Sequence, residues 1–503
     1  MTLPNPDSSP QSSFSRDVLT LVTGTTFAQI ITILSAPVIT RLYGPEAFGI
    51  LSIFTAIISI FSVFVCFRYE LAIVLPKSNE EAANVFGLCI LILLFISIVS
   101  IPFLWLSQKS LEQLLNVPQL GQFLWLIPPS ILLSGTYLAL NYWNTRTKQF
   151  HRLAIAQVTR SCATTGTQLG MGFIGYTSGG VLIIATLIGQ LVLTLTLGMQ
   201  TIREHLRFFK QNITLKGMNA VLKQYINFPK YDLWSALLNT IGSSLPTFIL
   251  SIYFNSAILG YYSLCLMVLG FPLGLIGNAI GQVFFQNAAE AKNISQTKLS
   301  ETVEKVLKPL IVLAYFPTII FVLIGPELFG VVFGVGWQES GVYARYLSFW
   351  IAIVFIAAPI STLFSIFQKQ KIGLIFNFIQ MVSRVIALLI GAIMGNVLIA
   401  IILFAIVGCI SNLIPLLYFL KLSDVSILKT LRIFFNYFLL SVPFIIIILF
   451  IQYLSLINDI GLVIFSFIVT ILYYFLAIKN DPELIILLKE ITSQIPIIKK
   501  YLN

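Results

Sequence analysis

Charged residues are scarce in this sequence, and that scarcity limits what kind of protein it encodes. Only 10% of the 503 residues are Asp, Glu, Lys or Arg, whereas soluble chains carry about a quarter. Hydrophobic residues make up 57% of the chain. So little charge cannot cover a water-exposed surface of this size. We therefore expect a membrane protein and not a soluble domain.

The side chains that metal and covalent chemistry need are also few. The five cysteines lie in apolar stretches without short paired spacing, which predicts buried, unreactive thiols. The two histidines, His151 and His205, lie in basic loops. No H-E-x-x-H, no G-x-x-x-x-G-K-[ST] and no acidic pair within a span is present. We therefore expect no metal, no cofactor, no ATP hydrolysis and no enzymatic activity.

Long apolar runs are abundant, and each is long enough to cross a bilayer, which takes about 20 residues. The first, at 18–40, exceeds the roughly 7–15 residues of a signal-peptide core, so we interpret it as a span. About fourteen spans are predicted, at 18–40, 47–67, 84–106, 122–143, 153–174, 180–202, 233–254, 257–285, 310–333, 342–367, 372–393, 397–420, 434–455 and 460–478. The predicted fold class is an all-α membrane protein.

Lys and Arg are distributed unevenly between the loops. With the N-terminus inside, roughly 25 of the 30 basic residues fall on the cytoplasmic side. Arg41, Lys109 and Arg345 remain outside, and Arg160 and Arg384 lie within spans. This bias predicts that both termini are cytoplasmic. It also accounts for the formal net charge of +11 without a nucleic-acid partner.

The two halves of the sequence resemble each other. Aligning Arg160 with Arg384 pairs Thr159 with Ser383 and places a basic pair at the end of each preceding span. Such repeats are typical of transporters whose substrate site lies between the halves. We therefore expect two pseudo-symmetric six-helix lobes around a central cavity. The predicted parts are a disordered tail at 1–15, an N-lobe at 16–202, a cytoplasmic linker at 203–232, a C-lobe at 233–420, two extra helices within 421–478 and a cytoplasmic tail at 479–503.

Arg160 and Arg384 are the main candidates for a substrate site. An arginine within a span costs roughly 2.5–3.5 kcal/mol, so it normally faces a bundle interior or a water-filled cavity. Arginine also binds phosphate bidentately and stays protonated. The alternative is that each arginine pairs with a carboxylate and only holds helices together. The polar residues on the same helix faces, expected to line the cavity, are Gln157, Thr164 and Gln168 beside Arg160, and Asn377 and Gln380 beside Arg384.

Arg41 and Arg345 lie near the outer ends of their spans, where basic residues are scarce. Each is either a second phosphate contact or an end residue whose side chain reaches the interface.

Charged residues also flank two spans on the predicted cytoplasmic side. Arg68 and Glu70 follow the second span, and Lys230 and Asp232 precede the seventh. As oppositely charged pairs at the cytoplasmic mouth they are candidates for a gate. Glu70 or Asp232 is then a candidate to take a proton or sodium ion. The alternative is that all four are ordinary loop charges.

Four sequence motifs indicate a resemblance to a known family. They are T-R-L-Y-G-P-E-A-F-G at 40–49, R-Y-E-L-A-I-V-L-P at 68–76, N-F-P-K at 227–230 and L-G-Y-Y-S at 259–263. With them the chain resembles bacterial polysaccharide-biosynthesis (O-antigen) flippases of the Wzx type, which belong to the multidrug/oligosaccharidyl-lipid/polysaccharide exporter superfamily. The likeness extends over about the first twelve predicted spans.

The resemblance implies a function in the bacterial inner membrane. Such a flippase moves oligosaccharide repeat units, linked by pyrophosphate to undecaprenol, between leaflets for O-antigen lipopolysaccharide, capsule or exopolysaccharide synthesis. The implied partners are the lipid-linked oligosaccharide, membrane lipids, and a polysaccharide polymerase with its chain-length machinery. The last two helices resemble those that help form a lipid-tail groove in the related lipid II flippase. The lipid II flippase itself and a cation-coupled drug or metabolite exporter remain alternatives.

Overall fold

The computed structural model describes residues 11–481, and within that range the secondary structure is helical, without a β strand. The predicted all-α fold is therefore confirmed. Part of the tail predicted at 1–15, residues 1–10, lies outside the described residues, as does 482–503 at the other end. Residues 11–15, the described part of that predicted tail, belong to the first helix.

The described chain divides into two compact units, with the boundary after Gly260. The first unit contains α1 (Gln11–Leu42), α2 (Pro45–Phe64), α3 (Asn79–Leu115), α4 (Ile127–Arg146), α5 (Phe150–Phe173), α6 (Gly179–Asn212), α7 (Leu215–Gln224) and α8 (Leu233–Tyr253). Its short turns of helix are η1 (Tyr69–Val74), η2 (Pro118–Leu126) and η3 (Phe228–Asp232). The predicted linker at 203–232 is thus itself mostly helical.

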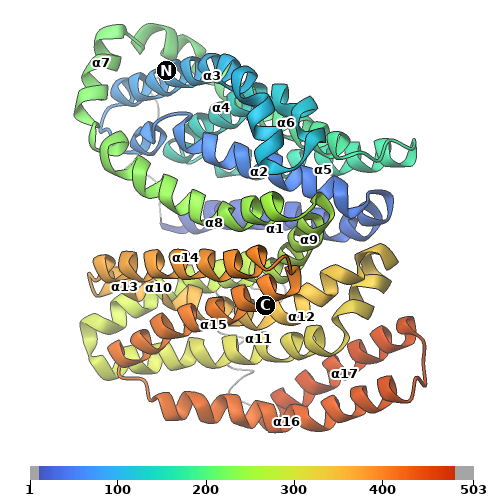
Figure 1. Cartoon of the computed structure of the whole chain (residues 1–503). Helices are drawn as coiled ribbons and strands as arrows, with labels where there is room; N and C mark the ends of the chain where they lie inside the picture. Colours follow the sequence, from blue (N-terminus) through green and yellow to red (C-terminus); the bar gives the residue numbers. More distant parts are fainter. Residues whose placement is uncertain (1–10, 482–503) are drawn as a thin grey trace. The chain divides into compact units, whose positions relative to one another are not determined.

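The boundary falls within α9 (Ser256–Pro272), and the second unit continues to the end of the described chain. It contains η4 (Leu273–Gly277), α10 (Asn278–Ile294), α11 (Gln296–Phe333), η5 (Val335–Trp337), α12 (Gln338–Ile360), α13 (Leu363–Ile366), α14 (Gln370–Ile393), α15 (Val397–Leu422), α16 (Ile427–Tyr453) and α17 (Asp459–Asn480). Helices α16 and α17 pack beside each other and against α11 (Figure 1).

Thirteen helices of the described chain are long and apolar enough to cross a membrane, and each matches a predicted span. The remaining predicted span, 153–174, is also a helix, α5, but is not among the thirteen. Its Gln, Thr and Arg side chains lower its mean hydropathy. Among the predicted spans of the described chain, the one left out of these thirteen therefore carries Arg160.

Helix α5 lies between α1 and α6, and small residues bring all three close together. A Cβ added at Gly24 of α1 would lie 2.5 Å from the Cβ of Ala154. A Cβ added at Gly189 of α6 would lie 1.8 Å from Oγ1 of Thr164. Between α1 and α5, the Ser161 hydroxyl donates to the Ala28 carbonyl at 2.8 Å. This packing fixes the rotation of α5 about its axis.

Helix α14 is held differently. It packs chiefly against α15, where a Cβ added at Gly391 would lie 2.3 Å from the backbone of Ala400. Helix α15 in turn packs against α12, and Gly408 of α15 leaves room for the Trp350 ring. These contacts place α14, α15 and α12 as neighbouring helices of the second unit.

Candidate functional site

Arg160 lies in the middle of α5 and is half-buried. Its guanidinium forms no ion pair with a carboxylate of the described chain, and it interacts electrostatically with Tyr137 of α4. Gln157, one turn earlier on α5, donates from Nε2 to the Tyr137 hydroxyl at 2.8 Å. The structure therefore groups Arg160 and Gln157 with a tyrosine that the sequence did not single out.

The other two predicted neighbours of Arg160 lie differently. Thr164 packs against Gly189 of α6, so it occupies a helix-packing position. Gln168 is half-buried, and its backbone carbonyl accepts a hydrogen bond from the Tyr43 hydroxyl at 2.7 Å. Of the three residues predicted beside Arg160, Gln157 is the one whose side chain reaches the same tyrosine.

Arg384 lies on α14 against aromatic side chains of neighbouring helices. Its guanidinium carbon is 5.4 Å from the centroid of the Trp350 ring of α12, within the range of a cation–π contact. Its Nε donates to the Gln380 carbonyl one turn earlier at 3.1 Å. Tyr262 of α9 interacts electrostatically with it, and Phe404 packs edge-on to Trp350. Among the described side chains no carboxylate pairs with Arg384.

The other residues predicted to line the cavity or contact phosphate lie on α1, α12 and α14. Asn377 is exposed and Gln380 is half-buried on α14. Arg41 is exposed in the last turn of α1. Arg345 of α12 is half-buried, and its Nε is buried without a hydrogen-bond acceptor among the described residues.

Three of the four predicted gate residues come together in the first unit. Arg68 Nε donates to Asp232 Oδ2 at 2.7 Å, and Arg68 Nη1 lies 3.4 Å from Glu70 Oε1. Lys230 instead lies exposed over the Tyr231 ring, at 5.2 Å from its centroid. Both acidic gate candidates, Glu70 and Asp232, therefore pair with Arg68.

Glu70 is the buried member of this group. Its side chain is 3% exposed, and Oε2 accepts no hydrogen bond from a described residue. Burial raises the pKa of Glu70, the Arg68 charge opposes that shift, and the Asp232 charge adds to it. The neutral form of this carboxyl is thus favoured compared with a carboxyl in water.

The aromatic partners of the arginines are what sequence reasoning missed. Trp350 could have been found from its position within a predicted span, because tryptophan is typically enriched at the membrane interface. Tyr137 and Tyr262 carried no comparable signal.

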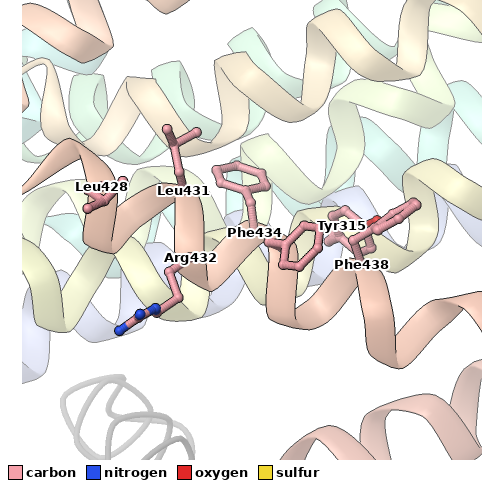
Figure 2. A pocket seen from close by; sticks show the side chains of 7 residues that line it. Tyr315, Leu428, Leu431, Arg432, Phe434 and Phe438 are labelled. Atoms are coloured by element: carbon pink, nitrogen blue, oxygen red, sulfur yellow. The ribbon is translucent and has the colours of Figure 1, made fainter.

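A pocket of about 660 Å³ lies beside α16 in the second unit (Figure 2). Arg432 is its charged residue, and the rest of its lining is aromatic or aliphatic. The lining consists of Tyr315 of α11 with Leu428, Leu431, Arg432, Phe434, Phe435 and Phe438 of α16.

Solved structures with the same fold are membrane transporters. The lipid II flippase MurJ, in an inward closed conformation, is similar with a TM-score of 0.65 and 13% identity, covering 93% of this chain and 99% of that one. An inward-facing multidrug resistance MATE family transporter of the MOP superfamily has a TM-score of 0.57 and 15% identity, covering 81% and 94%. A MOP superfamily transporter from Pyrococcus furiosus has a TM-score of 0.50 and 14% identity, covering 82% and 96%.

No curated protein sequence matches this chain. A model of the polysaccharide biosynthesis protein family matches residues 38–342, from within α1 to within α12. This match agrees with the resemblance carried by the motifs at 40–49 and 68–76. Because it covers more than half of the 503 residues, the chain belongs to the polysaccharide biosynthesis protein family.

Proposed function

We propose that this protein is a flippase that moves undecaprenyl-pyrophosphate-linked oligosaccharide repeat units across the bacterial inner membrane for surface polysaccharide synthesis. The observation that carries the proposal is the pair of arginines in α5 and α14. Neither Arg160 nor Arg384 forms an ion pair with a carboxylate of the described chain. An arginine kept in a membrane helix without a counter-charge is available to an anionic ligand.

In this mechanism Arg160 and Arg384 are the proposed primary contacts to the diphosphate of the substrate. The stacking of Arg384 on Trp350 holds its guanidinium in place. Arg41 and Arg345 are the proposed secondary phosphate contacts. Transport further requires that the two access states bind the substrate with different affinity. A ligand that binds both states equally does not change the equilibrium between them.

The pocket beside α16 is our proposed site for part of the polyprenyl tail. Its lining is apolar and aromatic, and Arg432 at its edge is placed to attract a phosphate (Figure 2). Phe435 and Phe438 are 58% and 46% exposed, so they offer apolar surface to a lipid chain.

We infer from the distribution of basic residues that both termini are cytoplasmic. A polysaccharide polymerase and its chain-length machinery are the proposed partners, since they would act on the exported repeat unit. The proposed activity is transport, without a cofactor and without covalent chemistry.

A deletion strain tests this function. Loss of the protein is expected to make polyprenyl-linked oligosaccharide accumulate, and mass spectrometry of the lipid extract identifies its sugars. Complementation with Arg160→Ala or Arg384→Ala is expected to leave export abolished at normal protein abundance, and Lys at either position to restore part of it. Normal surface polysaccharide with both Ala variants would contradict the proposal.

A lipid II flippase is the second candidate, favoured by a fold likeness that covers 99% of MurJ. If this candidate is right, the protein should rescue a strain depleted of its own lipid II flippase. The deletion strain should then accumulate no oligosaccharide repeat unit. For a cation-coupled exporter of cationic drugs we find less support, because the buried charges at Arg160 and Arg384 would repel such substrates.

A further inference from the structure

Helix α8 is attached to the rest of the first unit in different ways at its two ends. Its C-terminal end is tightly joined to α3 and α2. The Ser251 hydroxyl donates to the Leu115 carbonyl, and Asn116 Nδ2 donates to the Phe254 carbonyl at 3.2 Å. A Cβ added at Gly49 of α2 would lie 1.8 Å from the Ser256 carbonyl oxygen, just beyond α8. These contacts hold the C-terminal end of α8 in place.

The N-terminal end of α8 is linked to the turn after α2 through an ion pair. It is preceded by η3, one turn of wide π-helix that contains Pro229. Tyr231 and Trp234 are 62% and 58% exposed. The ion pair between Asp232 and Arg68 links this end to the turn after α2, and the Asp232 side chain is 42% exposed.

Arg68 has a second carboxylate within reach, because it lies on an unusual turn. Phe67 and Arg68 both adopt left-handed backbone angles, with φ of 47° and 66°, which is uncommon for residues other than glycine. This turn points the Arg68 side chain toward Asp232 while placing Glu70 two residues along in a buried position. One guanidinium is therefore shared between two acids.

We propose that α8 is a gate helix whose N-terminal end opens about its fixed C-terminal end, that the Arg68–Asp232 ion pair is the latch, and that a proton bound at Glu70 strengthens the latch. The proposal deepens the proposed function and rests on it for its role in transport. The titratable or charged groups that interact with Glu70 are Arg68 on its own turn, Asp232 of η3, Cys89 of α3 and Tyr142 of α4.

The direction of the effect follows from charge. When Glu70 is ionised, it competes with Asp232 for the same guanidinium, and two like charges lie near each other. When Glu70 is neutral, Arg68 is left to Asp232 alone. Protonation therefore favours the latched state, and loss of the proton favours release of α8.

Hydrogen–deuterium exchange on the full-length protein in nanodiscs, without substrate, tests the latch. Asp232→Asn is expected to speed amide exchange at 228–240 by about two- to fivefold, the range that a partly exposed ion pair supplies. Exchange at 246–260 should not change. Glu70→Gln, which keeps the size of the side chain and mimics its neutral form, is expected to slow exchange at 228–240.

Glu204→Gln is the matched control. It removes an ion pair with Arg152 between α5 and α6, and its carboxylate is 43% exposed, close to the value for Asp232. It should leave exchange at 228–240 unchanged.

The proposal is overturned if Asp232→Asn leaves exchange at 228–240 unchanged, or speeds 246–260 equally, or if Glu70→Gln speeds exchange. If the Glu70→Gln protein does not accumulate, Asp232→Asn by itself tests whether the Arg68–Asp232 ion pair is the latch. Because exchange is measured without substrate, failure of the latch is separate from failure of the flippase function, which the export assays on Arg160 and Arg384 decide.

Discussion

The guanidinium of Arg384 lies over the Trp350 ring, 5.4 Å from its centroid, and the two residues come from different helices of the second unit. The tryptophan is buried and its indole Nε1 has no acceptor among the described residues. An aromatic face attracts a guanidinium without neutralising its charge. Arg384 is therefore fixed in position and still positive, as an anion-binding residue should be.

This relationship predicts that Trp350→Phe lowers export by about two- to fivefold, because phenylalanine offers a weaker cation–π face. Protein abundance should remain normal, since an aromatic ring still occupies the space beside Gly408. The measurement is the rate of surface polysaccharide synthesis in the complemented deletion strain. Trp105→Phe, at a 76% exposed position of α3, is the control. Equal rates in both variants would show that the stacking has no role.

Arg160→Ala is expected to leave the melting temperature unchanged or to raise it. A structural arginine would leave an uncompensated buried carboxylate when removed, which is strongly destabilising. Arg160 has no such partner among the described residues, so its removal only relieves the cost of a charge within the membrane. Thermal unfolding in detergent is the measurement. A marked fall in melting temperature would mean that Arg160 holds helices together.

The sequence predicted the helices better than their ends. The predicted spans fall on helices of the described chain, but hydropathy marks only the part of a helix that lies in lipid. Helix α3 continues to Leu115, well past the predicted end at 106, and stops where Asn116 adopts a left-handed conformation. Helix α6 likewise continues to Asn212. Nothing in an apolar run signals how far a helix extends into water.

The candidate site was predictable only in part, because helical periodicity gives an angle but not a neighbour. Gln157 and Thr164 lie on the same side of α5 as Arg160, yet Gln157 contacts Tyr137 whereas Thr164 packs on Gly189. The sequence likewise does not show that α8 belongs to the first unit. This membership depends on close backbone contacts, such as those at Gly49 and Gly260, and a sequence repeat does not encode such contacts.

Gly189→Ala tests the packing that orients Arg160. The new methyl group would meet Thr164 Oγ1 at 1.8 Å, and such overpacking destabilises by about 1–3 kcal/mol. Gly166→Ala on α5 is the matched control, because nothing lies within 4 Å of its added Cβ and alanine favours a helix over glycine by about 1 kcal/mol. Chemical unfolding should therefore show opposite signs for the two variants. The same sign in both would contradict the close approach of α5 and α6.

Arg432→Gln is expected to reduce retention of polyprenyl phosphate by the purified protein severalfold. The substitution removes the positive charge at the edge of the pocket beside α16 while leaving its aromatic lining intact. Native mass spectrometry counts the lipid that remains bound. Arg203→Gln, at an exposed position of α6, provides the control for a general loss of positive charge. Equal retention in both variants would show that the pocket does not hold the lipid phosphate.

The stability of the protein should depend on pH through Glu70. Because burial raises its pKa in the folded state, Glu70 binds a proton more tightly when folded than when unfolded. Its favourable contribution is fully present below the unfolded value, near 4.5, and is lost as pH rises through the raised folded pKa. Glu70→Gln cannot ionise, so its melting temperature should change less over this window and exceed that of the wild type above it. Parallel curves for the two proteins would show that Glu70 ionises as freely in the folded chain as in water.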